Sequence, residues 1–136
     1  MTTAIETSVL LDVFGADPAF GESSKQALRR AIRDGRVVAC EVVWAEVTGF
    51  FPSLAAAREA MDRLGVEFSP LALESALEAG RVWKIYRARG GARHRVAADF
   101  LIGAHALGQT ERLLTRDRGF YRSYFRRLPI LEPERV

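Results

Sequence analysis

Short apolar runs alternate with longer amphipathic segments along the chain. Within the longer segments, apolar positions recur every three or four residues, as in a helix that buries one face. Because strands and helices alternate, we predict an α/β fold, a doubly wound, about five-stranded parallel sheet with helices on both faces. The predicted strands are 4–5, 36–39, 66–68, 112–115 and 129–131, and the predicted helices are 9–14, 24–34, 41–50, 53–64, 72–89, 96–107 and 120–125.

Two of the predicted helices carry an acid where an apolar residue is expected. The segment 96–107 is almost wholly apolar around its whole circumference, so a helix there would take Asp99 into the interior. In 41–50, Glu46 shares a helical face with Val43 and Phe50, so we predict that it also points inward. A buried carboxylate needs a partner or a metal. The alternative for Asp99 is an N-cap, since aspartate is a preferred capping residue.

Composition limits the class of protein. The length of 136 residues fits one domain, which we place at 1–136, and 49% hydrophobic with 27% charged residues excludes a disordered chain. Cys40 is the single cysteine, and neither a secretory signal nor a run of about eighteen apolar residues is present, so we expect a cytoplasmic protein without a membrane partner. The formal net charge of +3 permits a nucleic-acid partner without requiring one.

Two further acids directly follow predicted strands. Glu6 follows 4–5, and Asp117 follows the strand that ends at Thr115. Ligands of open α/β sheets bind outside the carboxyl ends of the strands, so we expect both acids at that edge. The pattern alone leaves the position of Asp99 relative to this edge open. A phosphoacceptor receiver domain would need a lysine near the acids, and a dinucleotide-binding domain would need G-x-G-x-x-G after the first strand; the sequence has neither.

Four segments together resemble the signature segments of PIN-domain ribonucleases, most of all the VapC toxins of bacterial toxin–antitoxin pairs. They follow the family's order and the resemblance extends from Ala4 to about Pro133. The segments are AIETSVLLD at 4–12, VWAEV at 43–47, ADFLIGAHA at 98–106 and LTRDRGFY at 114–121.

The resemblance implies a metal-dependent endoribonuclease that hydrolyses RNA phosphodiester bonds in an acidic pocket. It implies Mg²⁺ or Mn²⁺ as cofactor, with a VapB-like antitoxin and a second copy of the chain, as a homodimer, for partners. Mg²⁺ prefers carboxylate oxygens and water, which agrees with an acidic site. By this resemblance the catalytic acids are Glu6, Glu46, Asp99 and Asp117, the metal ligands are Glu6, Asp99 and Asp117, and the supporting hydroxyls are those of Thr7, Ser8 and Thr115.

Glu6 departs from the family, which has aspartate at this position. Its extra methylene adds about 1.5 Å of reach at a site with strict octahedral geometry. An alternative function is therefore a catalytically weakened PIN domain that binds RNA or an antitoxin.

Arginines beside the acidic segments are candidates for contact with RNA. Arg116 and Arg118 flank Asp117, and Arg93 and Arg95 lie in a basic loop before the Asp99 segment. Solvated turn arginines explain the same residues equally well. We expect the aromatic residues of 120–125, including Tyr121, to belong to the core rather than to stack on bases.

Overall fold

The computed structural model describes residues 1–91, 97–117 and 119–134. It contains a five-stranded, wholly parallel sheet in the order β3-β2-β1-β4-β5, which confirms the predicted fold class. From β1 the chain adds β2 and then β3 on one side of the sheet. It then returns to the other side of β1, where it adds β4 and β5. The strands are β1 Thr2–Ile5, β2 Arg36–Ala39, β3 Val66–Phe68, β4 Arg112–Leu114 and β5 Ile130–Leu131.

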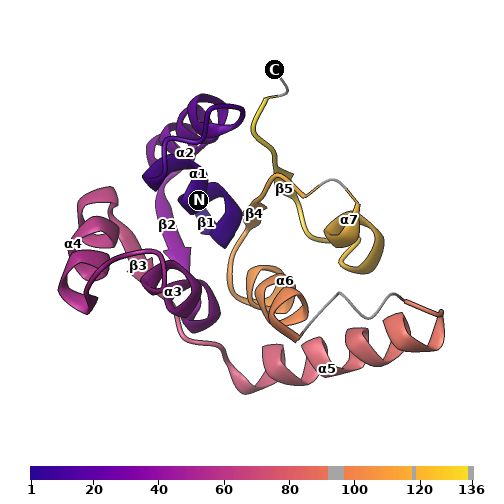
Figure 1. Ribbon diagram of the computed structural model, residues 1–136. Coiled ribbons are helices and arrows are strands. Elements are labelled where there is room, and N and C mark those ends of the chain that lie inside the picture. Colours follow the sequence, from indigo (N-terminus) through magenta and orange to yellow (C-terminus); the bar gives the residue numbers. More distant parts are fainter. Residues whose placement is uncertain (92–96, 118, 135–136) are drawn as a thin grey trace.

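Helices cover both faces of the sheet, as a parallel sheet requires. Figure 1 shows α1 and α2 on one side and α6, with α5 outside it, on the other, while α7 lies beside β5. Among the described residues, no helix is long and apolar enough to cross a membrane. The helices are α1 Thr7–Phe14, α2 Gly21–Asp34, α3 Glu41–Thr48, α4 Leu54–Leu64, α5 Leu73–Ala88, α6 Ala97–Gln109 and α7 Phe120–Tyr124.

The central strands β1 and β4 set the position of the acidic segments. Ile5 pairs with Leu114 in parallel register, and the amide of Glu6 donates to the carbonyl of Leu114 at 3.0 Å. Both strands therefore end at the same edge, and the residues that follow them start from neighbouring points. This edge is the one at which open α/β sheets bind ligands.

Helix α6 is buried along most of its length between the sheet and α5. Its residues 102–106 are all buried, and Gly103 lies so close to Phe125 that an added Cβ would come within 2.5 Å of that ring. On its other side, Phe100 stacks on Trp83 of α5, with ring centroids 5.8 Å apart. The apolar character of this helix around its circumference follows from its position in the middle layer.

Candidate active site

Glu6 lies at the junction between β1 and α1. Its backbone is extended, at φ −87° and ψ 152°, and it occupies the N-cap position, although its side chain makes no capping hydrogen bond. Both carboxylate oxygens instead accept hydroxyl hydrogen bonds: Oε1 from Ser8 and Oε2 from Tyr121, the latter at 2.6 Å. The side chain is half-buried, and its orientation is fixed from two directions.

Tyr121 brings the acidic segments together. It belongs to α7 and is 1% exposed, as expected of a core residue, but its hydroxyl reaches Glu6. Burial raises the pKa of this phenol well above its usual value, and the hydrogen bond to Glu6 and the negative charges of Glu6, Asp99 and Asp117 raise it further. Three acids from distant parts of the sequence therefore act on one buried hydroxyl. Sequence reasoning missed this contact because the aromatic residues of α7 look alike in sequence, and nothing local distinguishes the tyrosine whose hydroxyl reaches Glu6.

Asp117 organises the turn between β4 and α7. Its Oδ1 accepts hydrogen bonds from the amides of Gly119 and Phe120, at 3.1 and 2.8 Å, so the side chain caps the first turn of α7. Its own amide donates to Oγ1 of Thr115 at 3.0 Å. Thr115 is fully buried, so its hydroxyl supports the backbone of Asp117. One carboxylate oxygen of Asp117 is thus fixed by the turn.

Asp99 lies in the first turn of α6 and is half-buried. Since Ala97 and Ala98 are already helical, Asp99 is not the N-cap that the sequence suggested as an alternative. A carboxylate in the first turn is favoured by the helix dipole. The negative charge of Asp99 is one of the causes that raise the pKa of the Tyr121 phenol, so Asp99 acts electrostatically on the hydroxyl that contacts Glu6.

The prediction that Glu46 points into the interior is wrong. Helix α3 ends at Thr48, so Phe50 does not continue its face and is itself 50% exposed. The buried residues of α3 are Val43 and Val47, four positions apart, and Glu46 is exposed. An eight-residue helix gives too short a pattern to choose between neighbouring faces.

Glu46 nevertheless lies beside the β1–α1 junction. Its Oε1 accepts a 2.6 Å hydrogen bond from Oγ1 of Thr7, the residue next to Glu6 in sequence. Thr7 and Ser8 therefore each donate to one of the predicted catalytic acids, Thr7 to Glu46 and Ser8 to Glu6. The two hydroxyls orient one carboxylate at the β1–α1 junction and one on α3.

Arg116 is held by a carboxylate that the sequence analysis did not single out. Its Nε and Nη2 donate to the two oxygens of Asp12, at 2.9 and 3.3 Å, and its guanidinium lies 4.4 Å from the ring centroid of Phe20. Asp12 is 4% exposed and also accepts from Ser24 at 2.8 Å. This network anchors the segment before Asp117 to α1 and α2. The other predicted RNA-binding residues, Arg93, Arg95 and Arg118, lie outside the described residues.

The donors at this edge are suited in kind to a hard divalent cation. Carboxylate oxygens are the ligands that Mg²⁺ and Mn²⁺ prefer, and Mg²⁺ usually keeps several waters and needs only one or two carboxylates. Within residues 1–91, 97–117 and 119–134, no group of three or more histidine, cysteine, aspartate or glutamate side chains is placed to hold one ion together. The chemistry of the donors therefore fits the cation, but they do not form a closed cage.

The fold is shared with proteins of known structure. The chain is similar to VapBC2 from Rickettsia felis bound to a DNA fragment from their promoter, with a TM-score of 0.76 and 14% identity over 98% of this chain and 100% of that chain. It is also similar to VapBC-1 from nontypeable Haemophilus influenzae, with a TM-score of 0.73 and 17% identity over 97% and 98% of the two chains. A third similar structure is a toxin–antitoxin complex from Klebsiella pneumoniae, with a TM-score of 0.70 and 18% identity over 98% of this chain and 99% of that chain.

These identities establish likeness of fold. No curated protein matches the chain in sequence. The PIN domain family matches residues 4–126, a range that includes Glu6, Glu46, Asp99 and Asp117. That match confirms the resemblance found in the four sequence segments, and the chain belongs to the PIN domain family.

Proposed function

We propose that this protein is a metal-dependent endoribonuclease and the toxin of a VapBC-type toxin–antitoxin pair. It would hydrolyse RNA phosphodiester bonds at the carboxyl edge of the sheet. The observation that carries the proposal is the convergence of Glu6, Asp99 and Asp117 on the hydroxyl of Tyr121, in a chain of the PIN domain family. Like charges repel one another, so a purely structural role does not explain why acids from three separate segments gather at one place.

One or two of the acids Glu6, Asp99 and Asp117 would bind Mg²⁺ or Mn²⁺ directly, and the others through its water ligands. A bound divalent ion supplies an activated water and neutralises negative charge that develops on the phosphate. The turn between β4 and α7 fixes Oδ1 of Asp117, and the charges of Asp99 and Asp117 both act on the hydroxyl of Tyr121. Holding the acids in place before substrate arrives reduces the reorganisation that the reaction needs.

The remaining predicted residues would act by positioning. Glu46 is exposed and held by Thr7, so it can orient a water at the edge without desolvation. Ser8 fixes Glu6, and Thr115 supports the backbone of Asp117. We therefore assign the three hydroxyls to the orientation of carboxylates rather than to direct contact with phosphate.

The partners follow from the same proposal. The structural matches are to VapBC assemblies and a toxin–antitoxin complex, which supports a VapB-like antitoxin as partner. A cationic side chain of the antitoxin placed among the acids would block the site by charge complementarity. We also propose that residues 1–136 form a single domain that assembles as a homodimer, and that it works inside the cell, where RNA and the antitoxin are found.

Cleavage of RNA by the purified protein tests the proposed function. We expect cleavage with millimolar Mg²⁺ or Mn²⁺, none with excess chelator, and a loss of at least about 100-fold in Asp99→Asn, in the range seen when a charge-stabilising group is removed. The matched control is Glu74→Gln, which removes the same charge from an exposed position on α5. Equal cleavage with and without chelator would refute the metal-dependent mechanism.

The alternative, a weakened PIN domain that acts by binding, has one observation in its favour. Both carboxylate oxygens of Glu6 already accept hydrogen bonds, from Ser8 and Tyr121, so the longer side chain is directed toward protein hydroxyls. Under this alternative, Glu6→Asp would raise the rate of RNA cleavage at least tenfold, an amount that corresponds to about 1.4 kcal/mol of transition-state stabilisation. Equal rates for the two proteins would remove the case for a weakened enzyme.

A further inference from the structure

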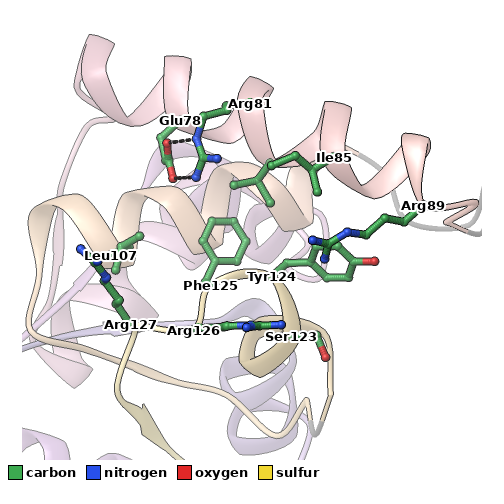
Figure 2. Close-up of a pocket in the computed structure, with 11 residues that line it drawn as sticks. Glu78, Arg81, Ile85, Arg89, Leu107, Ser123, Tyr124, Phe125, Arg126 and Arg127 are labelled. Carbon is green, nitrogen blue, oxygen red and sulfur yellow. Dashed lines mark hydrogen bonds and ion pairs between the residues drawn. The ribbon is translucent and has the colours of Figure 1, made fainter.

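A polar cavity with none of the four predicted acids in its lining lies between α5 and the segment that joins α7 to β5. Its volume is about 530 Å³, within the range of cavities that bind small ligands. Figure 2 shows Arg81 and Arg89 reaching into it from α5, and Arg126 and Arg127 from the opposite wall. The hydroxyl-bearing residues Ser123 and Tyr124 complete that wall.

The charge of this pocket is strongly one-sided. Four arginines line it against one carboxylate, Glu78, an excess of three positive charges that equals the formal net charge of the whole chain. Glu78 forms a two-pronged pair with Arg81, with both N···O distances 2.7 Å, so it fixes one guanidinium. Within the described part of the chain, no carboxylate pairs with Arg89, Arg126 or Arg127.

The pocket and the acids both contact one short helix, α7. Tyr121 of α7 faces Glu6, whereas Tyr124 of the same helix lines the pocket. The two tyrosines are three positions apart, about 4.5 Å along the helix axis, so a single RNA strand can contact residues on both sides of this link. Three carboxylates repel a polyanion, and a group of arginines at this distance offsets that repulsion.

We propose that this pocket binds phosphate groups of an RNA strand whose neighbouring nucleotide lies at the acids. The inference rests on the proposed function and names a second contact for the same substrate. Arginine suits it because the planar guanidinium donates to two phosphate oxygens at once. The observations favour RNA over an acidic peptide, because only a strand that must enter the acidic edge needs positive charge beside it.

Binding of a fluorescein-labelled oligouridylate of about twelve nucleotides, measured by anisotropy without divalent ions, tests the pocket independently of cleavage. The variant is Arg126→Gln with Arg127→Gln, two exposed residues whose side chains make no described hydrogen bond. The control is Lys25→Gln with Arg29→Gln, which removes the same charge from exposed positions on α2, on the other side of the sheet (Figure 1).

We expect the pocket variant to bind about tenfold more weakly at 0.1 M salt, and its plot of log K against log salt to be shallower by about 1.4, since each phosphate contact on a single strand contributes about 0.7. The control should change both quantities much less, and melting temperatures should be unchanged. Equal loss in variant and control would overturn the proposal. So would an oligoglutamate peptide of the same charge that binds through the pocket while RNA does not.

The two proposals fail in different ways. If the protein cleaves RNA but the pocket variant binds and cleaves like the control, the pocket inference alone is wrong. If no RNA is cleaved under any metal condition but binding depends on Arg126 and Arg127, the pocket is supported and the nuclease assignment is wrong.

Discussion

The hydroxyl of Tyr121 donates a 2.6 Å hydrogen bond to Oε2 of Glu6, across 115 positions of the sequence. Tyr121→Phe removes only this hydroxyl from a residue that is 1% exposed. We expect a loss of about 1–3 kcal/mol in the free energy of unfolding, typical of a hydrogen bond to a charged group, together with slower RNA cleavage as Glu6 loses one anchor. Chemical denaturation and a cleavage assay measure the two effects.

Tyr124→Phe provides the control for that prediction. Tyr124 lies on the same helix and is half-buried, but its hydroxyl makes no hydrogen bond with the described residues. We expect it to leave the free energy of unfolding close to that of the unmodified protein, because no hydrogen bond is lost. If the two variants behaved alike, the bond to Glu6 would have no particular role.

The acids at the sheet edge predict a response of stability to metal. A ligand that binds only the folded state stabilises by mass action, by about 2.7 kcal/mol at one hundred times its dissociation constant. We therefore expect millimolar Mg²⁺ or Mn²⁺ to raise the melting temperature, and the rise to shrink in Asp99→Asn but not in Glu74→Gln. If metal raised the melting temperature of Asp99→Asn as much as that of the unmodified protein, Asp99 would not be a metal ligand.

Two two-pronged arginine–carboxylate pairs differ mainly in burial. Arg116 pairs with Asp12, which is 4% exposed, whereas the side chains of Arg36 and Glu67 are 63% and 50% exposed. We expect Arg116→Gln to lower the free energy of unfolding by about 2 kcal/mol, because Asp12 keeps a buried charge, and Arg36→Gln to lower it much less, because both of its groups are solvated. Urea denaturation of the two variants makes the comparison, and equal effects would contradict it.

His105 predicts a loss of stability in mild acid. It is 1% exposed, with Nε2 2.9 Å from Oγ of Ser69, and burial lowers its pKa below 6.5, against a smaller opposite effect of Glu41. Above pH 6.5 the imidazole of His105 is mainly neutral in both the folded and the unfolded state. As the pH falls below 6.5 the unfolded state takes up the proton first, so stability falls by up to about 1.4 kcal/mol per pH unit.

His105→Gln removes this titration. The difference in the free energy of unfolding between the variant and the unmodified protein should therefore change with pH below 6.5 and be constant above it. A difference that stays constant from pH 7 to pH 5 would show that His105 does not titrate differently in the two states.

One added methyl group should have opposite effects on stability at two helical glycines. In α6, a Cβ on Gly103 would lie 2.5 Å from the ring of Phe125, whereas in α5 a Cβ on Gly80 would meet nothing within 4 Å. We expect Gly103→Ala to destabilise by about 1–3 kcal/mol through overpacking, and Gly80→Ala to stabilise by up to about 1 kcal/mol through helix propensity. Thermal unfolding measures both, and a stabilising Gly103→Ala would contradict the close packing of α6.

The sequence alone determined the fold class and the positions of the acids along the chain. Short apolar runs and helical spacing depend on neighbours within a few residues, so they predicted all five strands and the placement of Glu6 and Asp117 after two of them. The same local pattern failed at Glu46, because a short helix offers two faces that differ by one residue and only packing chooses between them.

Tertiary structure decided which side chains meet at the site. Tyr121 with Glu6 and Arg116 with Asp12 are separated by 115 and 104 positions, so no periodicity in the sequence relates them. They meet because β1 and β4 are neighbours in the sheet, with Ile5 opposite Leu114, and the helices after these strands fold back over the same edge. The sequence thus supplied the acids, and the pairing of two strands far apart in the chain brought them to one tyrosine hydroxyl.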